Sequence, residues 1–289
     1  MAAVHKPYRS LLYIPGSKER ALEKATGLAA DGIIFDLEDA VAPDEKANAR
    51  ALVAETLRNR DYGNRGLMVR INGFDTEWAM DDLDVIAATG AEAILLPKVN
   101  RASDIERLSA YLDAHSACQN TGIWAMMETP MSFLYAAEIA AAPRMIGMVM
   151  GTNDLASDLG ADLTIERPSM LGALSMGLLA ARAHGLVCVD GVYNKFKDTE
   201  GLRQQCEQGR SFGMDGKSLI HPAQLEIANE VFAPSPEALD LARRQIEAFD
   251  EAKAKGLGIA VLEGKIVENL HVASAQKLLD RQAMIEAMA

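Results

Sequence analysis

The stretch "GIWAMMETPMSF" (residues 122–133) joins an apolar strand to a charged end. Six of its first seven residues are apolar or Gly, which is typical of a strand buried on both faces of a parallel sheet. The run then ends on Glu128, which Thr129 and Pro130 follow. Because a buried, unpaired carboxylate costs free energy, Glu128 either reaches solvent in a loop or lies in a site that needs its charge.

Seven further runs share this apolar and often β-branched character, and longer amphipathic stretches separate them. The runs are residues 10–14, 32–38, 66–72, 93–99, 145–150, 186–192 and 217–221. Helical patterns between them include residues 17–30, where Ser17 can cap the first turn, and 43–60, which begin with Pro43. Eight alternating units predict an α/β fold that closes into a (β/α)₈ TIM barrel, with an open doubly wound sheet as the alternative.

The C-terminal part exceeds what a barrel needs. After a Pro-rich joint, residues 234–256 show a helical pattern, residues 258–267 are typical of a short hairpin, and residues 271–287 predict a last helix. We therefore expect a barrel domain over residues 1–232 and a C-terminal hairpin-and-helix extension over residues 233–289.

Composition sets the class of protein. Hydrophobic residues make up 49% and charged residues 24% of the 289-residue chain, as in an ordinary globular protein. Apolar runs stay far below the roughly 20 residues that span a membrane, and the N-terminus lacks a signal-peptide core, so we expect a cytoplasmic protein. The net charge of −12 argues against nucleic-acid binding. Three cysteines without a CxxC pair predict free thiols and no zinc site.

Polar or conformationally special residues stand at nearly every predicted strand end. In a barrel these carboxyl ends meet on one face, where active sites are built, so we expect several of the residues to converge on a ligand. They are Gly16, Glu38, Asp39, Arg70, Asn72, Lys98, Glu128, Asp154, Asp190 and His221.

The pair Glu128 and Asp154 is the natural centre of such a site. Two carboxylates, completed by waters and a substrate oxygen, suit Mg²⁺, with Mn²⁺ as an alternative. Arg70 suits a carboxylate or a developing enolate, and a salt bridge to Glu38 or Asp39 is its structural alternative. A metal, carboxylates and an arginine together can stabilise an enolate, which indicates C–C bond cleavage or formation next to a carbonyl.

Six motifs, in this order and spacing, carry a family resemblance. The stretches "RSLLYIPG", "FDLEDAV", "VRIN", "LPKV", "METP" and "GTNDLA" resemble the citrate lyase β-subunit-like branch of the HpcH/HpaI aldolase family, and "GKIVENLHV" resembles its tail. The resemblance implies a homotrimeric or homohexameric TIM barrel. It also implies a Mg²⁺-dependent carbon–carbon lyase that cleaves a 3-hydroxyacyl-coenzyme A thioester, such as malyl- or citramalyl-coenzyme A, to an acyl-coenzyme A and a 2-keto acid.

The resemblance also implies roles for individual catalytic residues. Glu128 and Asp154 would bind Mg²⁺, with Glu128 also contacting substrate. Arg70 would bind substrate and offset enolate charge. The acids Glu38 and Asp39 of "FDLEDAV" would order metal-bound waters and Arg70 from outside the ligand sphere.

Tyr13, Arg20 and Lys24 match the coenzyme A-contacting positions of related lyases, so they would bind its phosphates or pantetheine. Arg20 and Lys24 are four residues apart and share one helix face. A solvated helix surface with neighbouring acids is the alternative.

The sequence departs from related malyl- and citramalyl-coenzyme A lyases at Glu268, because the matching tail position in those lyases looks like Asp. That Asp is supplied across the subunit interface as a proton-transfer group. Glu268 would therefore act in trans as an acid/base, and residues 233–289 would contribute to the oligomer interface and to a neighbouring active site. The alternative is that Glu268 only caps the final helix near His271.

Four other functions are alternatives to the lyase. The first is a citrate lyase β subunit that acts on a citryl carrier-protein thioester, and the second is a malyl-coenzyme A thioesterase. The third is a coenzyme A-independent pyruvate aldolase, although "LEDAV" here replaces the catalytic His that those enzymes have after the second strand. The fourth is a non-catalytic acyl-carrier scaffold, which would have no need of a metal pair.

Overall fold

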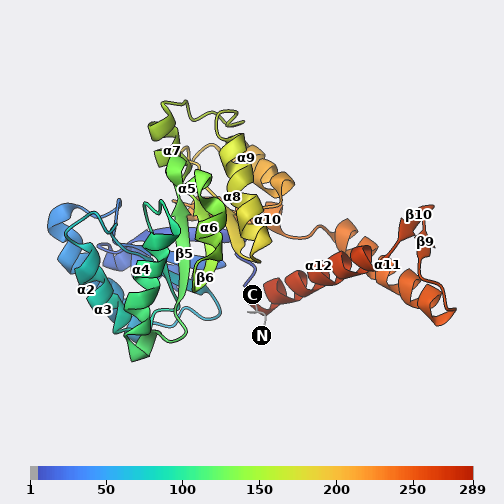
Figure 1. Cartoon of the computed structure of the whole chain (residues 1–289), viewed down its shortest axis with the longest axis horizontal. Coiled ribbons are helices and arrows are strands. Elements are labelled where there is room, and N and C mark those ends of the chain that lie inside the picture. Colours follow the sequence, from blue (N-terminus) through green and yellow to red (C-terminus); the bar gives the residue numbers. More distant parts are fainter. Residues whose placement is uncertain (1–5, 289) are drawn as a thin grey trace. The chain divides into compact units, whose positions relative to one another are not determined.

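The computed structural model describes residues 6–288 (Figure 1). In this range eight parallel strands close a barrel in sequence order. Each strand pairs with the next, and β8 returns to β1, with Lys217 opposite Ser10. The predicted TIM barrel is therefore confirmed. The strands are β1 Ser10–Pro15, β2 Gly32–Asp36, β3 Gly66–Arg70, β4 Ala93–Leu96, β5 Gly122–Met127, β6 Met145–Met150, β7 Val187–Asp190 and β8 Gly216–Leu219.

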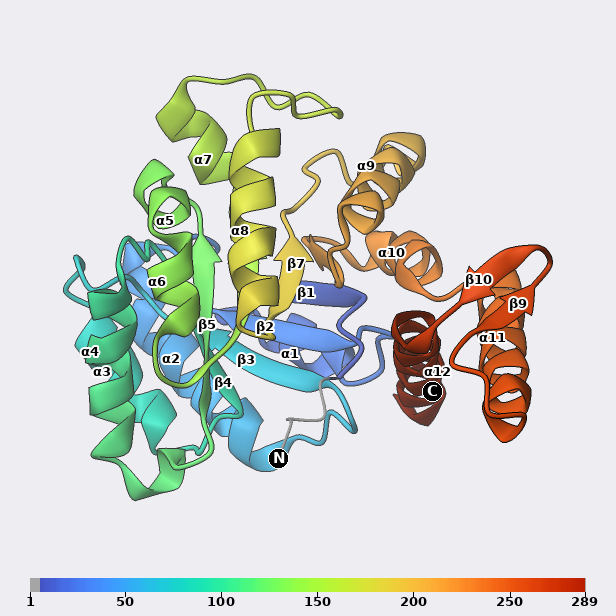
Figure 2. The ribbon, with the colours of Figure 1, turned by 45° about the vertical axis from the view of Figure 1, so that its right-hand side comes forward.

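Helices surround the barrel strands, as Figure 2 shows for α2, α4, α6 and α8. Their apolar side chains are buried in one core cluster with those of the strands. No helix in the described range combines the length and apolarity that crossing a membrane requires. The helices of this part are α1 Glu19–Ala25, η1 Pro43–Glu45, α2 Lys46–Asn59, α3 Ala79–Ala87, α4 Ala102–Asp113, η2 Ser116–Cys118, α5 Pro130–Leu134, α6 Ala136–Ala141, α7 Thr152–Leu159, α8 Leu171–Ala183, α9 Thr199–Phe212, η3 Pro222–Gln224 and α10 Leu225–Phe232.

Predicted and observed elements differ at their ends. The predicted strands 32–38 and 93–99 stop at Asp36 and Leu96. Asp36 accepts from the backbone N–H groups of Glu38 and Ala40 and so turns the chain into a loop, and Pro97 has no N–H to donate to the ladder. The first helix is shorter than predicted and begins after Lys18, whose side chain forms no cap, so the predicted cap at Ser17 is wrong. Helix α10 lies in a stretch for which the sequence predicted no element.

The barrel interior is filled by side chains that alternate along the strands. Leu11, Ile34, Met68, Trp124 and Val149 belong to one buried cluster inside the barrel. The Trp124 ring fits because β6 has Gly147 beside it, where a Cβ would come within 2.4 Å of the ring. This packed interior closes the barrel below the carboxyl ends of the strands.

A second compact unit begins at Ala233. It contains α11 Pro236–Ala254, the antiparallel pair β9 Ala260–Leu262 and β10 Lys265–Val267, and α12 Asn269–Met288. Glu263 and Gly264 both have positive φ, the geometry of a tight two-residue hairpin turn. The predicted hairpin-and-helix extension is thus present.

Candidate active site

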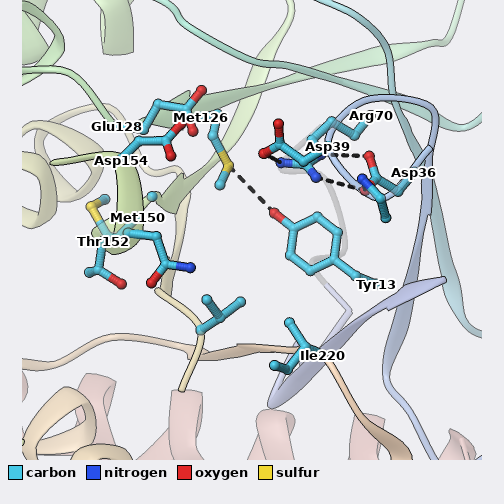
Figure 3. A pocket seen from close by; sticks show the side chains of 14 residues that line it. Tyr13, Asp36, Asp39, Arg70, Met126, Glu128, Met150, Thr152, Asp154 and Ile220 are labelled. Atoms are coloured by element: carbon cyan, nitrogen blue, oxygen red, sulfur yellow. Dashed lines mark hydrogen bonds and ion pairs between the residues drawn. The ribbon is translucent and has the colours of Figure 1, made fainter. Parts of the chain in front are cut away.

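A layer of polar side chains closes the top of the barrel interior. Tyr13, Asp36 and Arg70 each stand two residues after a side chain of the interior cluster, and Glu128 stands two residues after Met126. Since side chains alternate along a strand, the four lie on the inner face of the barrel. They line a cavity of about 280 Å³ (Figure 3), together with Asp39, Ala40, Met126, Met150, Gly151, Thr152, Asn153, Asp154, Val192 and Ile220.

Glu128 is held at the end of β5 and does not reach bulk solvent. Its side chain is only 2% exposed, and its Oε1 accepts a hydrogen bond of 2.7 Å from the backbone N–H of Lys98. Burial raises the pKa of Glu128, and the positive charge of Lys98 opposes that shift. Gly151 lets the next strand pass closely, because a Cβ there would lie 2.3 Å from Cβ of Glu128.

Asp154 comes from the first turn of α7, not from the strand end itself. Its side chain is about one-third exposed and lies beside Glu128 in the cavity (Figure 3). The structure therefore brings together the two carboxylates that the sequence singled out, from β5 and α7.

The ammonium group of Lys98 lies against both of these carboxylates. It forms an ion pair with Asp154 and lies 3.8 Å from Oε1 of Glu128. The two acids therefore converge on one cationic position. Within residues 6–288 no cluster of three or more His, Cys, Asp or Glu side chains forms a metal cage. A pair of carboxylates with open positions fits Mg²⁺, which usually keeps waters or substrate oxygens as further ligands.

Arg70 is held by Asp36, a carboxylate that the sequence patterns do not single out. Its Nε and Nη2 donate hydrogen bonds of 2.7 Å each to Asp36, its directly paired neighbour on β2. Nη1 lies 2.8 Å from Glu38 and 3.5 Å from Asp39, and the guanidinium lies 4.8 Å from the centre of the Tyr13 ring. Burial lowers the pKa of Arg70, but the charges and hydrogen bonds of its neighbours, Asp36 first among them, together outweigh this effect and raise the pKa. Asp36 thus occupies the guanidinium edge formed by Nε and Nη2, and Nη1 is the nitrogen that lies beside Glu38 and Asp39.

Glu38 and Asp39 differ in their surroundings. Burial raises the pKa of Glu38 to about 7, although Arg70 favours its charged form. The Asp39 side chain is 65% exposed and lines the cavity. The loop that carries both is fixed by Asp36, which accepts backbone hydrogen bonds from Glu38 and Ala40 at 2.9 and 3.2 Å.

Of the three residues expected at coenzyme A, Tyr13 lies apart from Arg20 and Lys24, which share helix α1. Tyr13 lies inside the cavity, where its hydroxyl donates to Sδ of Met126 at 3.5 Å (Figure 3). Arg20 and Lys24 are exposed on α1 and do not line the cavity. Their exposure leaves them accessible to an anionic ligand.

Glu268 stands immediately before α12 in the second unit and is exposed. Its backbone N–H donates to Nδ1 of His271 at 3.1 Å, and its carbonyl accepts from the N–H groups of His271 and Val272. The backbone of Glu268 thus takes part in the start of the final helix.

The sequence patterns single out Lys98 only as a polar strand-end residue without a specific role, and they do not single out Asp36. A period-of-two count along 32–36 would have found Asp36, since Ile34 faces the interior and Asp36 follows it by two. Lys98 escapes such a count because its φ of +54° breaks the strand alternation.

Known proteins with similar sequences include two groups with different names. The chain is 60% identical over 287 residues, 99% of each chain, to a (3S)-malyl-CoA thioesterase of Cereibacter sphaeroides strain ATCC 17029. It is 36% identical, over 98% of this chain and 96% of the other, to the L-malyl-CoA/beta-methylmalyl-CoA lyase of the same strain. The primary expectation of a carbon–carbon lyase is therefore wrong: the full-length relatives at 57–60% identity are named as thioesterases, which are hydrolases.

A solved structure gives the same fold. The chain superposes with a TM-score of 0.78 and 30% identity, over 95% of this chain and 97% of the other, on the CitE protein of Mycobacterium tuberculosis in complex with magnesium, acetoacetate and coenzyme A. Residues 9–222 match the family described as HpcH/HpaI aldolase/citrate lyase. The family resemblance predicted from the six motifs is confirmed, and the chain belongs to the HpcH/HpaI aldolase/citrate lyase family of enzymes.

Proposed function

We propose that this protein is a hydrolase that cleaves the thioester of (3S)-malyl-coenzyme A to malate and free coenzyme A. The observation that carries the proposal is the 60% identity, over 99% of both chains, with a protein named for that activity, against 36% with a lyase.

The chemistry requires water to add to the thioester carbonyl, the C–S bond to break, and a proton to reach the departing thiolate. Arg70 Nη1, beside the cavity, is the group that can offset the negative charge on the carbonyl oxygen. Glu38, with a pKa near 7, can accept a proton from water and return one at neutral pH. Asp36 holds Arg70 in place, and Asp39 can order water at the rim.

Glu128 and Asp154 are the residues that would hold Mg²⁺, for which Mn²⁺ can substitute. The bound ion would supply a fixed positive charge that orients an anionic malyl group. Support comes from the convergence of both carboxylates on the Lys98 ammonium and from the magnesium in the CitE complex.

Arg20 and Lys24 would bind the phosphates of coenzyme A, with Tyr13 contacting the acyl end of the substrate. The exposure of both cations and the coenzyme A in the CitE complex support this assignment. Replacing both with Ser should raise KM for malyl-coenzyme A in low salt and leave kcat unchanged, and an unchanged KM would remove them from the binding site.

Glu268 would donate or accept a proton at the site of a neighbouring subunit in a homotrimer or hexamer, which would make residues 233–289 part of that site. Mixing inactive Glu268→Gln with inactive Asp154→Ala subunits under exchange conditions should then restore some activity. No recovery despite proven exchange, or a fully active Glu268→Gln enzyme, would remove Glu268 from the mechanism.

The deciding experiment is incubation of (3S)-malyl-coenzyme A with the purified protein and Mg²⁺. Thiol release is followed with a disulfide reagent, and glyoxylate with phenylhydrazine. We expect free thiol and malate in equal amounts, without glyoxylate, and no thiol from Asp154→Ala. Formation of acetyl-coenzyme A and glyoxylate as the main products would overturn the hydrolase proposal.

A further inference from the structure

Lys98 lies at the position where the two proposed metal ligands converge. Within residues 6–288 it is the one basic side chain that forms an ion pair with Glu128 or Asp154. Both carboxylates need a cation. Glu128 is almost fully buried, and Asp154 shares the same cavity.

The backbone of Lys98 is fixed independently of its ammonium group. Its φ is +54°, which is uncommon for a residue with a side chain, and its N–H donates to Glu128 at 2.7 Å. Its carbonyl accepts from Nδ2 of Asn100 at 3.1 Å, and Asn100 in turn accepts from the Thr129 hydroxyl at 2.7 Å. The strained backbone therefore holds one oxygen of Glu128 whatever the side chain does.

A second cavity borders Lys98 and offers its side chain an alternative position. Lys98 lines a space of about 270 Å³, together with Phe74, Asp75, Leu96, Pro97, Asn100 and Asp104. Two of these residues are carboxylates, which can receive the ammonium. A divalent ion between Glu128 and Asp154 would repel an ammonium only a few ångströms away, so the two cations exclude each other.

We propose that Lys98 is a built-in competitor of the divalent metal: its ammonium neutralises Glu128 and Asp154 in the metal-free protein and swings into the neighbouring cavity when the metal binds. Lys98 thereby sets the metal affinity of the site. The inference rests on the proposed metal ligands, and it is independent of which thioester the enzyme takes.

The test is a titration of the metal-stripped, full-length protein with Mn²⁺, followed by the electron paramagnetic resonance signal of the free ion. Lys98→Gly removes the ammonium and accepts the positive φ, and Lys98→Asn is a second variant whose side chain also tolerates that conformation. Lys98→Arg is the control that keeps the charge. If Lys98 occupies the site in about nine of ten molecules, both neutral variants should bind Mn²⁺ about tenfold more tightly, and the Arg variant should not.

A residue that merely supported the ligands would give the opposite result, because its loss would weaken metal binding. Equal or weaker Mn²⁺ affinity in the folded neutral variants, or no binding by any form, would overturn the inference. Thiol release from malyl-coenzyme A is measured separately with the same proteins. Tighter Mn²⁺ binding by the neutral variants, with no hydrolysis by the wild-type protein, would refute only the proposed function. Hydrolysis by the wild-type protein, with unchanged Mn²⁺ affinity in the neutral variants, would refute only the role of Lys98.

Discussion

Two charged clusters lie in the barrel domain, and their charge balance is opposite. Near β7 and β8, Asp190 accepts from Arg167 at 2.7 Å and from Lys217 at 2.9 Å, and all three side chains are at most 1% exposed. Gln208 accepts from Arg167, and Gln205 and the backbone carbonyl of Gly191 accept from Lys217. Two cations there share one carboxylate, in a space that is sealed from solvent.

The cavity beside β2, β3 and β5 has the reverse arrangement. Arg70 and Lys98 are the cations, and they contact five carboxylates. Those carboxylates are Asp36, Glu38, Asp39, Glu128 and Asp154. The sealed cluster is satisfied by side chains and one backbone carbonyl of the fold, whereas the open one lacks positive charge and faces a cavity. Such a deficit is expected where a cation binds, since unpaired buried charge is otherwise costly.

The comparison predicts the largest loss of activity at Asp154. Asp154→Ala should lower kcat for thiol release about a thousandfold or more, because one carboxylate cannot hold the metal and leave a place for substrate. It should also weaken Mn²⁺ binding, with little change in the free energy of unfolding, since Asp154 is partly exposed. Full activity of this variant, or of the wild-type enzyme in excess EDTA, would contradict the metal assignment.

Asp190→Asn should give the opposite pattern. The change leaves Arg167 and Lys217 buried without a counter-charge, so the free energy of unfolding should fall by about 3–5 kcal/mol. The folded fraction should keep its kcat, because this cluster lies outside the cavity lining. Urea unfolding and kinetics at low temperature measure both quantities. A stable but inactive variant would show that the sealed cluster takes part in the chemistry.

Arg70 belongs to the open cluster, and Arg70→Lys should lower kcat by about 100- to 1,000-fold. A lysine cannot keep the two hydrogen bonds to Asp36 and also present a nitrogen beside Glu38. Steady-state kinetics separate this effect from binding, because KM should change much less than kcat. An unchanged kcat would leave Arg70 as a structural ion pair.

The sequence predicted the barrel because its signal is repeated eight times, and each apolar run needs only its neighbours to become a parallel strand. It also selected Glu128, Asp154 and Arg70, since polar side chains behind apolar runs are conspicuous. It missed the partners that tertiary contacts create. The Arg70–Asp36 pair depends on strand register, and the position of Lys98 depends on one residue with positive φ. It ranked a lyase above a hydrolase because the motifs shared across the family do not separate the two reactions.

Glu38 gives the smallest expected effect and tests whether the open cluster is short of positive charge. Its pKa is raised from 4.5 to about 7, mainly by burial, with Asp39, Glu128 and Asp36 adding to the shift against Arg70. Between these two pH values the folded protein keeps a proton that the unfolded chain has released, so stability falls as the pH rises through this window. Glu38→Gln removes the titration, and its free energy of unfolding relative to wild type should therefore increase by about 2 kcal/mol from pH 5 to pH 8. Urea unfolding of the metal-free proteins measures the difference. A pH-independent difference would mean that Arg70 alone already balances Glu38, and the contrast between the two clusters would then rest on Glu128 and Asp154.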